Sequence, residues 1–273
     1  MSGGPTSGTH DDPSVLERAS PPETIARGGQ IAQLIADSTG LVVQASAVPN
    51  FVAVRETMGK GEAHIGWLDT FNYVLARQKH GVEVGLVTER RGTTSYSGQF
   101  NVRADSSINS LQDLAGRVMC WVDPSSASGY TIPRITLQAN GIDPDSDLEA
   151  VFVYSHQNVI SQVYNGACDV GATYADARSS IAGDSPNVEQ VVVVLYTTAD
   201  IPYDSISFGQ DVPEEMRDQI IEALLEIAAT EEGRAALEEF YSITGLQGAS
   251  DSIYDGFRAE LSQAGVDIED LAE

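Results

Sequence analysis

The chain alternates between two patterns of apolar residues. In one, apolar residues alternate with polar ones or run on without a break, as in strands; in the other they recur every three or four positions, as in amphipathic helices. Strands are predicted at residues 14–20, 41–48, 63–68 and 82–90, with helices at 21–40, 50–61 and 69–81. Strands that alternate with helices predict βαβ units, in which a mostly parallel sheet carries helices on both faces.

A second α/β unit begins near residue 104. Strands are predicted at 98–104, 117–123, 148–155, 168–174 and 188–198, with helices at 107–116, 129–141 and 156–166. Three acidic amphipathic helices then close the sequence, at 213–230, 231–245 and 252–265. Residues 1–13 are rich in Gly, Ser, Pro and Asp, and we expect them to form a disordered tether.

Charge narrows the range of partners. The formal net charge is −25, which argues against a nucleic acid or an anionic membrane surface as partner, since both need positive fields. The N-terminus lacks the basic and apolar regions of a signal segment, and no apolar run reaches the roughly 20 residues of a membrane helix.

Lys60 and Lys79 are the only lysines. A strongly acidic composition with so little lysine predicts that the protein is adapted to high salt, because salt screens the repulsion between carboxylates. The alternative is that the acidic surface only aids solubility.

The two cysteines, Cys120 and Cys168, allow one disulfide. Each lies beside an apolar run, which favours two small buried side chains over a bridge. The four histidines show no metal-binding spacing. We therefore expect no metal and no cofactor.

The stretch "DPSSASGYTIP" follows the apolar run "VMCWV", where a buried strand leads into a helix. The first N–H groups of a helix have no partner within it, and together with the helix dipole they attract anions. Ser125, Ser126 and Ser128 add hydroxyl donors, and Gly129 permits close approach of the backbone. A plain helix cap would need one serine, so three indicate an oxyanion site.

Other site types fit less well. The loop has no G-x-x-x-x-G-K-[ST] and no G-x-S-x-G, so neither a nucleotide P-loop nor an esterase nucleophile is supported. Ser128, His156 and Asp176 could be combined into a catalytic triad, but three common residue types at such separations are weak evidence for one.

Four segments resemble the phosphonate, phosphite and phosphate substrate-binding components of ABC importers, which are type II periplasmic binding proteins. They begin at Tyr96, Asp123, Tyr154 and Ile201, and read "YSGQFNVRADSSINSLQDLAGR", "DPSSASGYTIP", "YSHQNVISQVYNGACDVGATYADAR" and "IPYDSISF". The resemblance implies an α/β fold of two lobes, each a mostly parallel sheet flanked by helices, joined by a two-segment hinge. One lobe would comprise 14–103 and 205–273, and the other 104–204.

The resemblance also implies a binding site. Ser126, Ser128 and the backbone around Ala127 would bind the oxyanion, His156 would add a donor, and Tyr96 would lie on the opposing side. Phe51 and Ala127 stand where relatives carry Tyr and Thr, so each departure removes a hydroxyl group from the implied site. Further site residues would be Ser125, Asp176, Asp204 and Trp67.

Several of these residues have ordinary structural alternatives. His156 could cap a helix, Tyr96 and Trp67 could belong to the aromatic core, Asp176 could pair with Arg178, and Asp204 could be a turn residue. Two carboxylates beside an anion site would repel a simple phosphate. We therefore expect a zwitterionic aminoalkylphosphonate as ligand, ahead of phosphite or phosphate.

The resemblance implies transport without catalysis. The ligand would stabilise the closed form of a monomeric, extracytoplasmic protein, tethered as a lipoprotein or free in the periplasm, and an ABC permease and ATPase would recognise that form. The alternatives are a protein that binds a sulfonate or a thiamine precursor, a serine hydrolase or phosphatase, and a sensor domain without a transporter.

Overall fold

A computed structural model describes residues 21–48, 50–124 and 126–271 of the chain. The predicted tether at 1–13 and the predicted strand at 14–20 lie outside these residues. Within the described ranges, no helix has both the length and the apolar character needed to cross a membrane.

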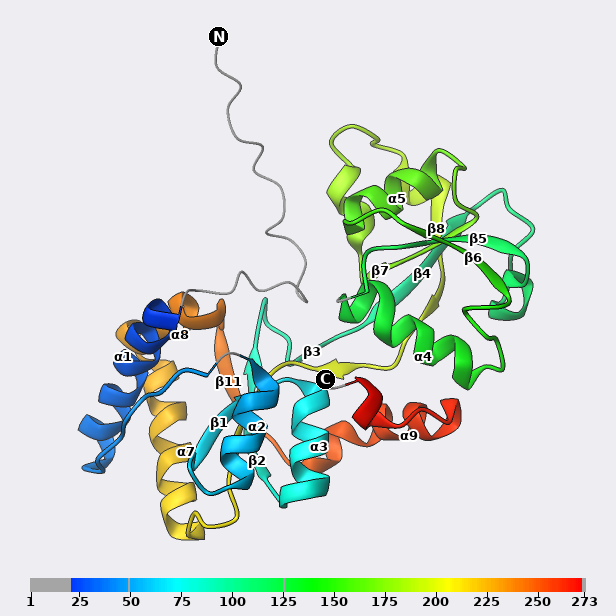
Figure 1. Cartoon of the computed structure of the whole chain (residues 1–273). Helices are drawn as coiled ribbons and strands as arrows, with labels where there is room; N and C mark the ends of the chain where they lie inside the picture. Colours follow the sequence, from blue (N-terminus) through cyan, green and yellow to red (C-terminus); the bar gives the residue numbers. More distant parts are fainter. Residues whose placement is uncertain (1–20, 49, 125, 272–273) are drawn as a thin grey trace. The chain divides into compact units, whose positions relative to one another are not determined.

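The described chain forms two compact units (Figure 1). The central unit contains Tyr96–Asp200 and Ala259–Val266, and the flanking unit contains 21–95, Ile201–Arg258 and 267–271. The chain enters the central unit after Ser95 and leaves it after Asp200. The short strands β3 (Ser95–Tyr96) and β9 (Ile201–Pro202) pair with each other at these two points. The lobe boundaries expected from the sequence stay a prediction.

The sheet of the central unit is mixed, with the strand order β6-β5-β7-β4-β8. Its strands are β4 (Gly98–Arg103), β5 (Arg117–Trp121), β6 (Leu148–Phe152), β7 (Val170–Tyr174) and β8 (Val192–Thr197). β5 pairs in parallel with β6 and β7, whereas β4 runs antiparallel to β7 and β8. The mostly parallel pattern predicted from the sequence therefore holds for three of these strands. β4, which brings the chain into the unit, lies between β7 and β8 and runs opposite to both.

Helices cover both faces of this sheet, as predicted. Leu137 of α4 (Ile132–Ala139) packs with Phe100 and Trp121, while Val163 of α5 (His156–Tyr164) packs with Cys120. Figure 1 shows the two helices on opposite sides of the strands. The shorter helical segments of the unit are η1 (Leu111–Leu114), a π-helical turn η2 (Ala127–Thr131), η3 (Ala177–Ile181) and α6 (Val188–Val191).

Two expectations for the central unit are wrong. The run "VEQVVVVLYTT" at 188–198 is predicted to be one strand, but its first residues form α6 before β8 begins. A turn at Asn187 starts this helix, and an apolar run alone does not distinguish a short helix from a strand. Cys120 and Cys168 form a disulfide, with 5.9 Å between their Cα atoms. Both cysteines are buried as expected, but their apolar surroundings did not indicate that they pair.

The sheet of the flanking unit has the order β1-β10-β2-β11. Its strands are β1 (Ile65–Leu68), β2 (Glu83–Glu89), β10 (Ser205–Phe208) and β11 (Gly245–Gly248). Every neighbouring pair runs antiparallel, so the expectation of a mostly parallel sheet is wrong for this unit. β10 returns from the central unit and inserts between β1 and β2 in the opposite direction, and β11 also runs opposite to β2.

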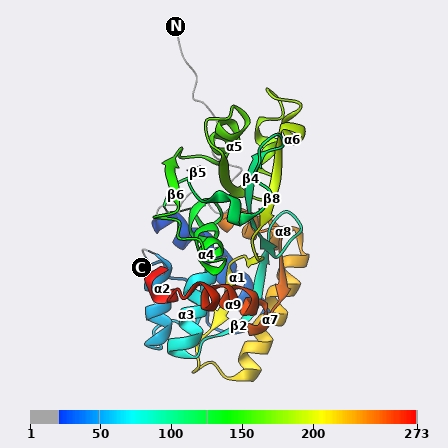
Figure 2. The ribbon, with the colours of Figure 1, turned by 90° about the vertical axis from the view of Figure 1, so that its right-hand side faces the viewer.

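Helices of the flanking unit form two groups. α1 (Pro21–Thr39), α7 (Glu214–Ala229) and α8 (Glu231–Tyr241) pack on one another, and α2 (Phe51–Gly59) packs on α3 (Thr70–His80). Figure 2 shows α2 and α3 on one side of β2, and α7 and α8 on the other. The remaining segments are η4 (Asp251–Tyr254), α9 (Asp255–Ala264), which continues into the central unit, and η5 (Ile268–Leu271).

The segment 41–48, predicted as a strand, pairs with no other strand in the described residues. Its exposure nevertheless alternates along the chain, and Leu41 and Val43 pack against the core formed by the sheet, α1, α7 and α8. The alternation therefore reflects one buried side of an extended segment rather than membership of the sheet.

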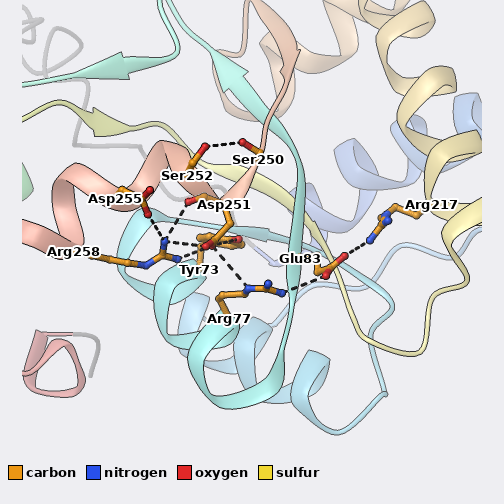
Figure 3. A network of polar contacts seen from close by, with 9 residues as sticks. All are labelled: Tyr73, Arg77, Glu83, Arg217, Ser250, Asp251, Ser252, Asp255 and Arg258. Carbon is orange, nitrogen blue, oxygen red and sulfur yellow. Dashed lines mark hydrogen bonds and ion pairs between the residues drawn. The ribbon is translucent and has the colours of Figure 1, made fainter.

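A network of charged groups joins α3, β2, α7 and α9 (Figure 3). The hydroxyl of Tyr73 donates to Asp251 at 2.8 Å, and Arg258 donates to the same carboxylate at 2.6 Å. Glu83 accepts hydrogen bonds from Arg77 and Arg217. Burial tends to raise the pKa of Asp251, but the hydrogen bonds from Arg258 and Tyr73 and the charges of Arg258 and Arg77 hold it below its ordinary value. The network links the helices on both sides of the sheet.

Candidate ligand-binding site

One edge of the central sheet collects most of the predicted site residues of this unit. β5, β6 and β7 run parallel, so their carboxyl ends lie at the same edge, which is where ligands bind in open α/β sheets. The serine loop follows β5, His156 follows β6, and Asp176 follows β7. The structure therefore brings Ser126, Ser128 and His156 to one edge by the topology of the sheet alone.

Ser126 caps the turn that starts the helical segment. Its Oγ accepts a hydrogen bond from the backbone N–H of Gly129 at 3.1 Å, and the side chain is 1% exposed. A Cβ at Gly129 would lie 2.4 Å from a methyl carbon of Val122, so the close packing of this turn against β5 requires glycine. Ser125 lies outside the described residues.

Ser128 is buried differently. Its side chain is 0% exposed, and its Oγ has no hydrogen-bond partner among the residues that the structure describes. A buried hydroxyl without a partner costs about 1–3 kcal/mol. Half-buried Ala127 precedes it in the π turn, and α4 follows directly, with Pro133 in its first turn. The turn thus places an unsatisfied donor at the start of a helix.

His156 is the first residue of α5 and is buried. Its Nδ1 accepts a hydrogen bond from the backbone N–H of Tyr174 at 3.1 Å, and the two rings are in contact. Ser155, rather than His156, caps the helix by accepting from the N–H of Asn158, so the capping alternative is wrong for His156. Because Nδ1 accepts this hydrogen bond, Nε2 is the ring nitrogen that can donate.

Asp176 and Tyr96 are more exposed. Asp176 has left-handed backbone geometry, with φ 63°. Its side chain is 81% exposed and lies 3.4 Å from Arg178, as the structural alternative expected. Tyr96 is half-buried in β3. Nδ1 of His156 accepts from the backbone N–H of Tyr174, whereas the histidine of a Ser-His-Asp triad donates from Nδ1 to its carboxylate.

The flanking sheet also has a polar edge. Leu68 at the end of β1 and Val87 near the end of β2 both pair with Ser205, the first residue of β10. Asp69, Arg90 and Asp204 therefore lie at this edge. Asp204 was expected from the sequence; Asp69 and Arg90 were not, because neither belongs to a recognisable motif.

Asp204 forms a buried ion pair with Arg90. One guanidinium nitrogen of Arg90 lies 2.7 Å from the carboxylate, and the two side chains are 8% and 13% exposed for Arg90 and Asp204 respectively. Burial raises the pKa of Asp204 above its ordinary value, and the charge and hydrogen bond of Arg90 oppose this effect. Asp204 is therefore more than a turn residue.

Asp69 caps α3, with its Oδ1 accepting from the backbone N–H of Asn72 at 2.8 Å. The side-chain amide of Asn72 donates to both carboxylate oxygens. Burial raises the pKa of Asp69 to about 6, and the charge of Asp204 adds to this shift.

The two remaining predicted residues are aromatic. Trp67 of β1 packs against the hydrophobic core and meets the ring of Phe240 edge to face, at 5.2 Å between centroids, so the core interpretation explains its position. Phe51 is half-buried at the first position of α2. Within the described ranges, His, Cys, Asp and Glu side chains form no cluster suited to a metal ion.

Known proteins share this architecture. The structure of XAC2383 from Xanthomonas citri bound to ATP aligns with a TM-score of 0.67 and 21% identity, covering 93% of this chain and 97% of that one. The chain has the fold of the type II periplasmic binding proteins, which it shares with the solved structure of PhnD1 from Prochlorococcus marinus at a TM-score of 0.58 and 16% identity, covering 93% of this chain and 99% of that one.

The family follows from the sequence comparison. The model of the family "ABC transporter, phosphonate, periplasmic substrate-binding protein" matches residues 14–254, so the chain belongs to this family. The phosphate-import protein PhnD of Mycolicibacterium smegmatis is 26% identical over 156 residues, 53% of this chain and 48% of the relative. The phosphonates-binding periplasmic protein of Escherichia coli is 24% identical over 204 residues, 73% of this chain and 60% of the relative. The chain thus aligns with about half to three fifths of the length of these relatives.

Proposed function

We propose that the chain is the solute-binding component of an ABC importer and that it captures a phosphonate-type oxyanion. The observation that carries this proposal is the buried Oγ of Ser128, which has no partner in the described part of the chain and stands at the start of a helix. A tetrahedral oxyanion would supply the missing acceptor, and the N–H groups of the first helical turn would add donors.

Neutral donors suit this protein. With a net charge of −25, the chain repels anions at long range, and capture depends on short-range hydrogen bonds that match the oxygens of the ligand. In the central unit these would come from Ser126, Ser128, His156 and the backbone at Ala127. Nε2 of His156 can donate, because Nδ1 already accepts from the N–H of Tyr174.

The other predicted residues complete the proposed site. Tyr96, Phe51 and Trp67 would line it, although the packing of Trp67 in the core makes its contact with ligand indirect at most. Phe51 and Ala127 lack hydroxyl groups and would contribute shape rather than hydrogen bonds. Asp176 and Asp204 would lie near the substituent of the phosphonate, and Ser125 would extend the serine loop.

The proposed mechanism breaks no bond. Ligand would stabilise a closed arrangement of two lobes, which the permease and ATPase would recognise outside the cytoplasmic membrane, with the protein acting as a monomer. The disulfide between Cys120 and Cys168 supports this location, because disulfides persist in oxidising compartments.

Calorimetry with methylphosphonate, phosphite, phosphate and an alkylsulfonate tests the proposal. We expect a phosphorus oxyanion to bind with a dissociation constant in the micromolar range or below, and more tightly than the sulfonate. Incubation with p-nitrophenyl phosphate and p-nitrophenyl acetate should yield no turnover, which separates binding from a hydrolase. If none of the oxyanions binds or raises the melting temperature, the proposal is wrong.

A further inference from the structure

Tyr154 lies at the carboxyl edge of the central sheet, beside the serine loop. Its backbone N–H donates to the carbonyl of Val122 at 2.8 Å, and the N–H of Val122 donates to the carbonyl of Gly129 at 3.3 Å. Tyr154 also precedes His156 by two residues along the chain. All these residues belong to the central unit, so this unit alone places Tyr154 beside the proposed anion site.

The side chain of Tyr154 is unusually exposed for an aromatic residue. Its exposed fraction is 77%, whereas Tyr196, the next most exposed tyrosine of the described residues, has 40%. A tyrosine at this exposure leaves roughly 150 Å² of its surface in water. The packing of the fold therefore gives no reason for a large aromatic ring at this position.

The backbone of Tyr154 is strained. It has left-handed geometry, with φ 62°, a region that bulky side chains disfavour most. Among the described residues, the others that are not glycine and have a positive φ are Arg91, Asp176 and Ser242. Glycine would adopt this conformation without strain, yet the chain carries a tyrosine here.

Neighbouring hydrogen bonds fix this conformation. The N–H of Val153 donates to the carbonyl of Trp121 at 3.0 Å, and the side-chain amide of Asn158 donates to the carbonyl of Val153 at 2.8 Å. Strain that is held in this way by its surroundings tends to occur at functional sites. An exposed ring on a fixed and strained backbone is therefore better explained by contact with a ligand than by packing.

The donors of this edge and the ring of Tyr154 suit the two parts of a phosphonate. The Oγ of Ser128 and Nε2 of His156 can donate to its oxygens. The carbon substituent accepts no hydrogen bond, so these donors cannot recognise it. An aromatic ring beside them can cover such a substituent and remove apolar surface of both groups from water.

We propose that Tyr154 determines the specificity of the site: its ring covers the organic substituent, so that the protein favours phosphonates with an aryl substituent, or an alkyl one larger than methyl. This inference rests on the proposed function, since it concerns which phosphonate the same site accepts. The aminoalkylphosphonate expected from the sequence was based on the carboxylates of Asp176 and Asp204, without this ring.

The test is calorimetry on the full chain with phenylphosphonate, methylphosphonate and 2-aminoethylphosphonate. We expect phenylphosphonate to bind about tenfold more tightly than methylphosphonate, because contact with the ring covers about 60 Å² of apolar surface. It should also bind more tightly than 2-aminoethylphosphonate, whose ammonium group stays hydrated.

Four variants separate the ring from the hydroxyl and from the backbone. Y154G and Y154N should bring the affinities for phenylphosphonate and methylphosphonate to within about twofold of each other, and both should fold, because glycine and asparagine tolerate the left-handed conformation. Y154F keeps the ring and should keep the preference. S242G is the matched control: Ser242 ends α8 in the flanking unit with φ 52°, so the variant relieves the same kind of strain and should leave the preference unchanged.

Each failure has a distinct meaning. A preference for phenylphosphonate that persists in Y154G and Y154N would overturn the inference alone, as would an unmodified protein that binds methylphosphonate or 2-aminoethylphosphonate more tightly. An equal loss of affinity for all three ligands in Y154F would assign the hydroxyl to the oxyanion and contradict the role of the ring. A failure of all three ligands, phosphite and phosphate to bind the unmodified protein would overturn the proposed function and this inference with it.

Discussion

The substitution Ser128→Ala should change stability and affinity in opposite directions. The hydroxyl is buried and has no partner within the described chain, so in the ligand-free protein it carries a desolvation cost of about 1–3 kcal/mol. Alanine removes this cost and leaves a void of about one atom. We therefore expect the free energy of unfolding to rise by about 1 kcal/mol.

In the complex the same hydroxyl would donate to an anionic oxygen. A hydrogen bond to a charged group is worth about 1.5–3 kcal/mol, so its loss should weaken binding roughly 10- to 150-fold. Urea unfolding without ligand and calorimetry with the tightest phosphorus oxyanion measure the two quantities on one preparation. Substitution of a residue that only supports the fold would not be expected to raise the free energy of unfolding and weaken ligand binding together.

Ser126→Ala is the matched control. The Oγ of Ser126 accepts from the N–H of Gly129, and removal of a capping oxygen costs about 1 kcal/mol. Ser126→Ala should therefore destabilise the ligand-free protein. If both variants lose stability alike and Ser128→Ala keeps its affinity, Ser128 is a structural residue and the reasoning about the serine loop fails.

Three further results are expected. Reduction of the Cys120–Cys168 disulfide, which closes a loop of 48 residues, should lower the free energy of unfolding by about 4 kcal/mol. Thermal melting with and without reductant measures the loss, and equal melting curves would contradict the prediction. Burial raises the pKa of Asp69 to about 6 from 3.8, so the folded state holds its proton more tightly and the contribution of this group to stability falls as the pH rises between these values. Asp69→Asn should keep the cap, remove this slope and raise the free energy of unfolding by about 3 kcal/mol at pH 8, as measured by urea unfolding. An unaltered slope would refute this. The net charge of −25 predicts a higher melting temperature at about 1 M salt than at about 0.1 M salt, because the Debye length falls from about 10 to about 3 Å. Equal melting temperatures at the two salt concentrations would contradict the interpretation of salt adaptation.

Local patterns predicted the elements that position the serine loop. The helix at 156–166 was expected and forms as α5, and Pro133 lies in the first turn of α4 as its chemistry requires. The segment 41–48 shows the limit of such patterns. Alternation reports which side of an extended segment is buried, but it does not show whether a neighbouring strand accepts its hydrogen bonds.

The features that sequence reasoning missed connect distant parts of the chain. Arg90 and Asp204 are 114 residues apart in the sequence, and Cys120 and Cys168 are 48 residues apart. In neither pair does the sequence around one residue identify its partner. The direction of β10 was missed for the same reason, because it depends on the chain returning from the central unit before it joins β1 and β2. Asp204 was therefore identified as a candidate while the residue that neutralises it was not.

The way the chain crosses between units also affects the order in which the protein can form. All strands of the central sheet lie within residues 98–197, whereas the flanking sheet needs β10 and β11, which end only at Gly248. During synthesis the central sheet can therefore pair completely while half of the flanking sheet does not yet exist. We expect nascent chains that end near residue 200 to resist proteolysis in their second half, and residues 21–48 and 50–95 to gain protection only when β11 has left the ribosome.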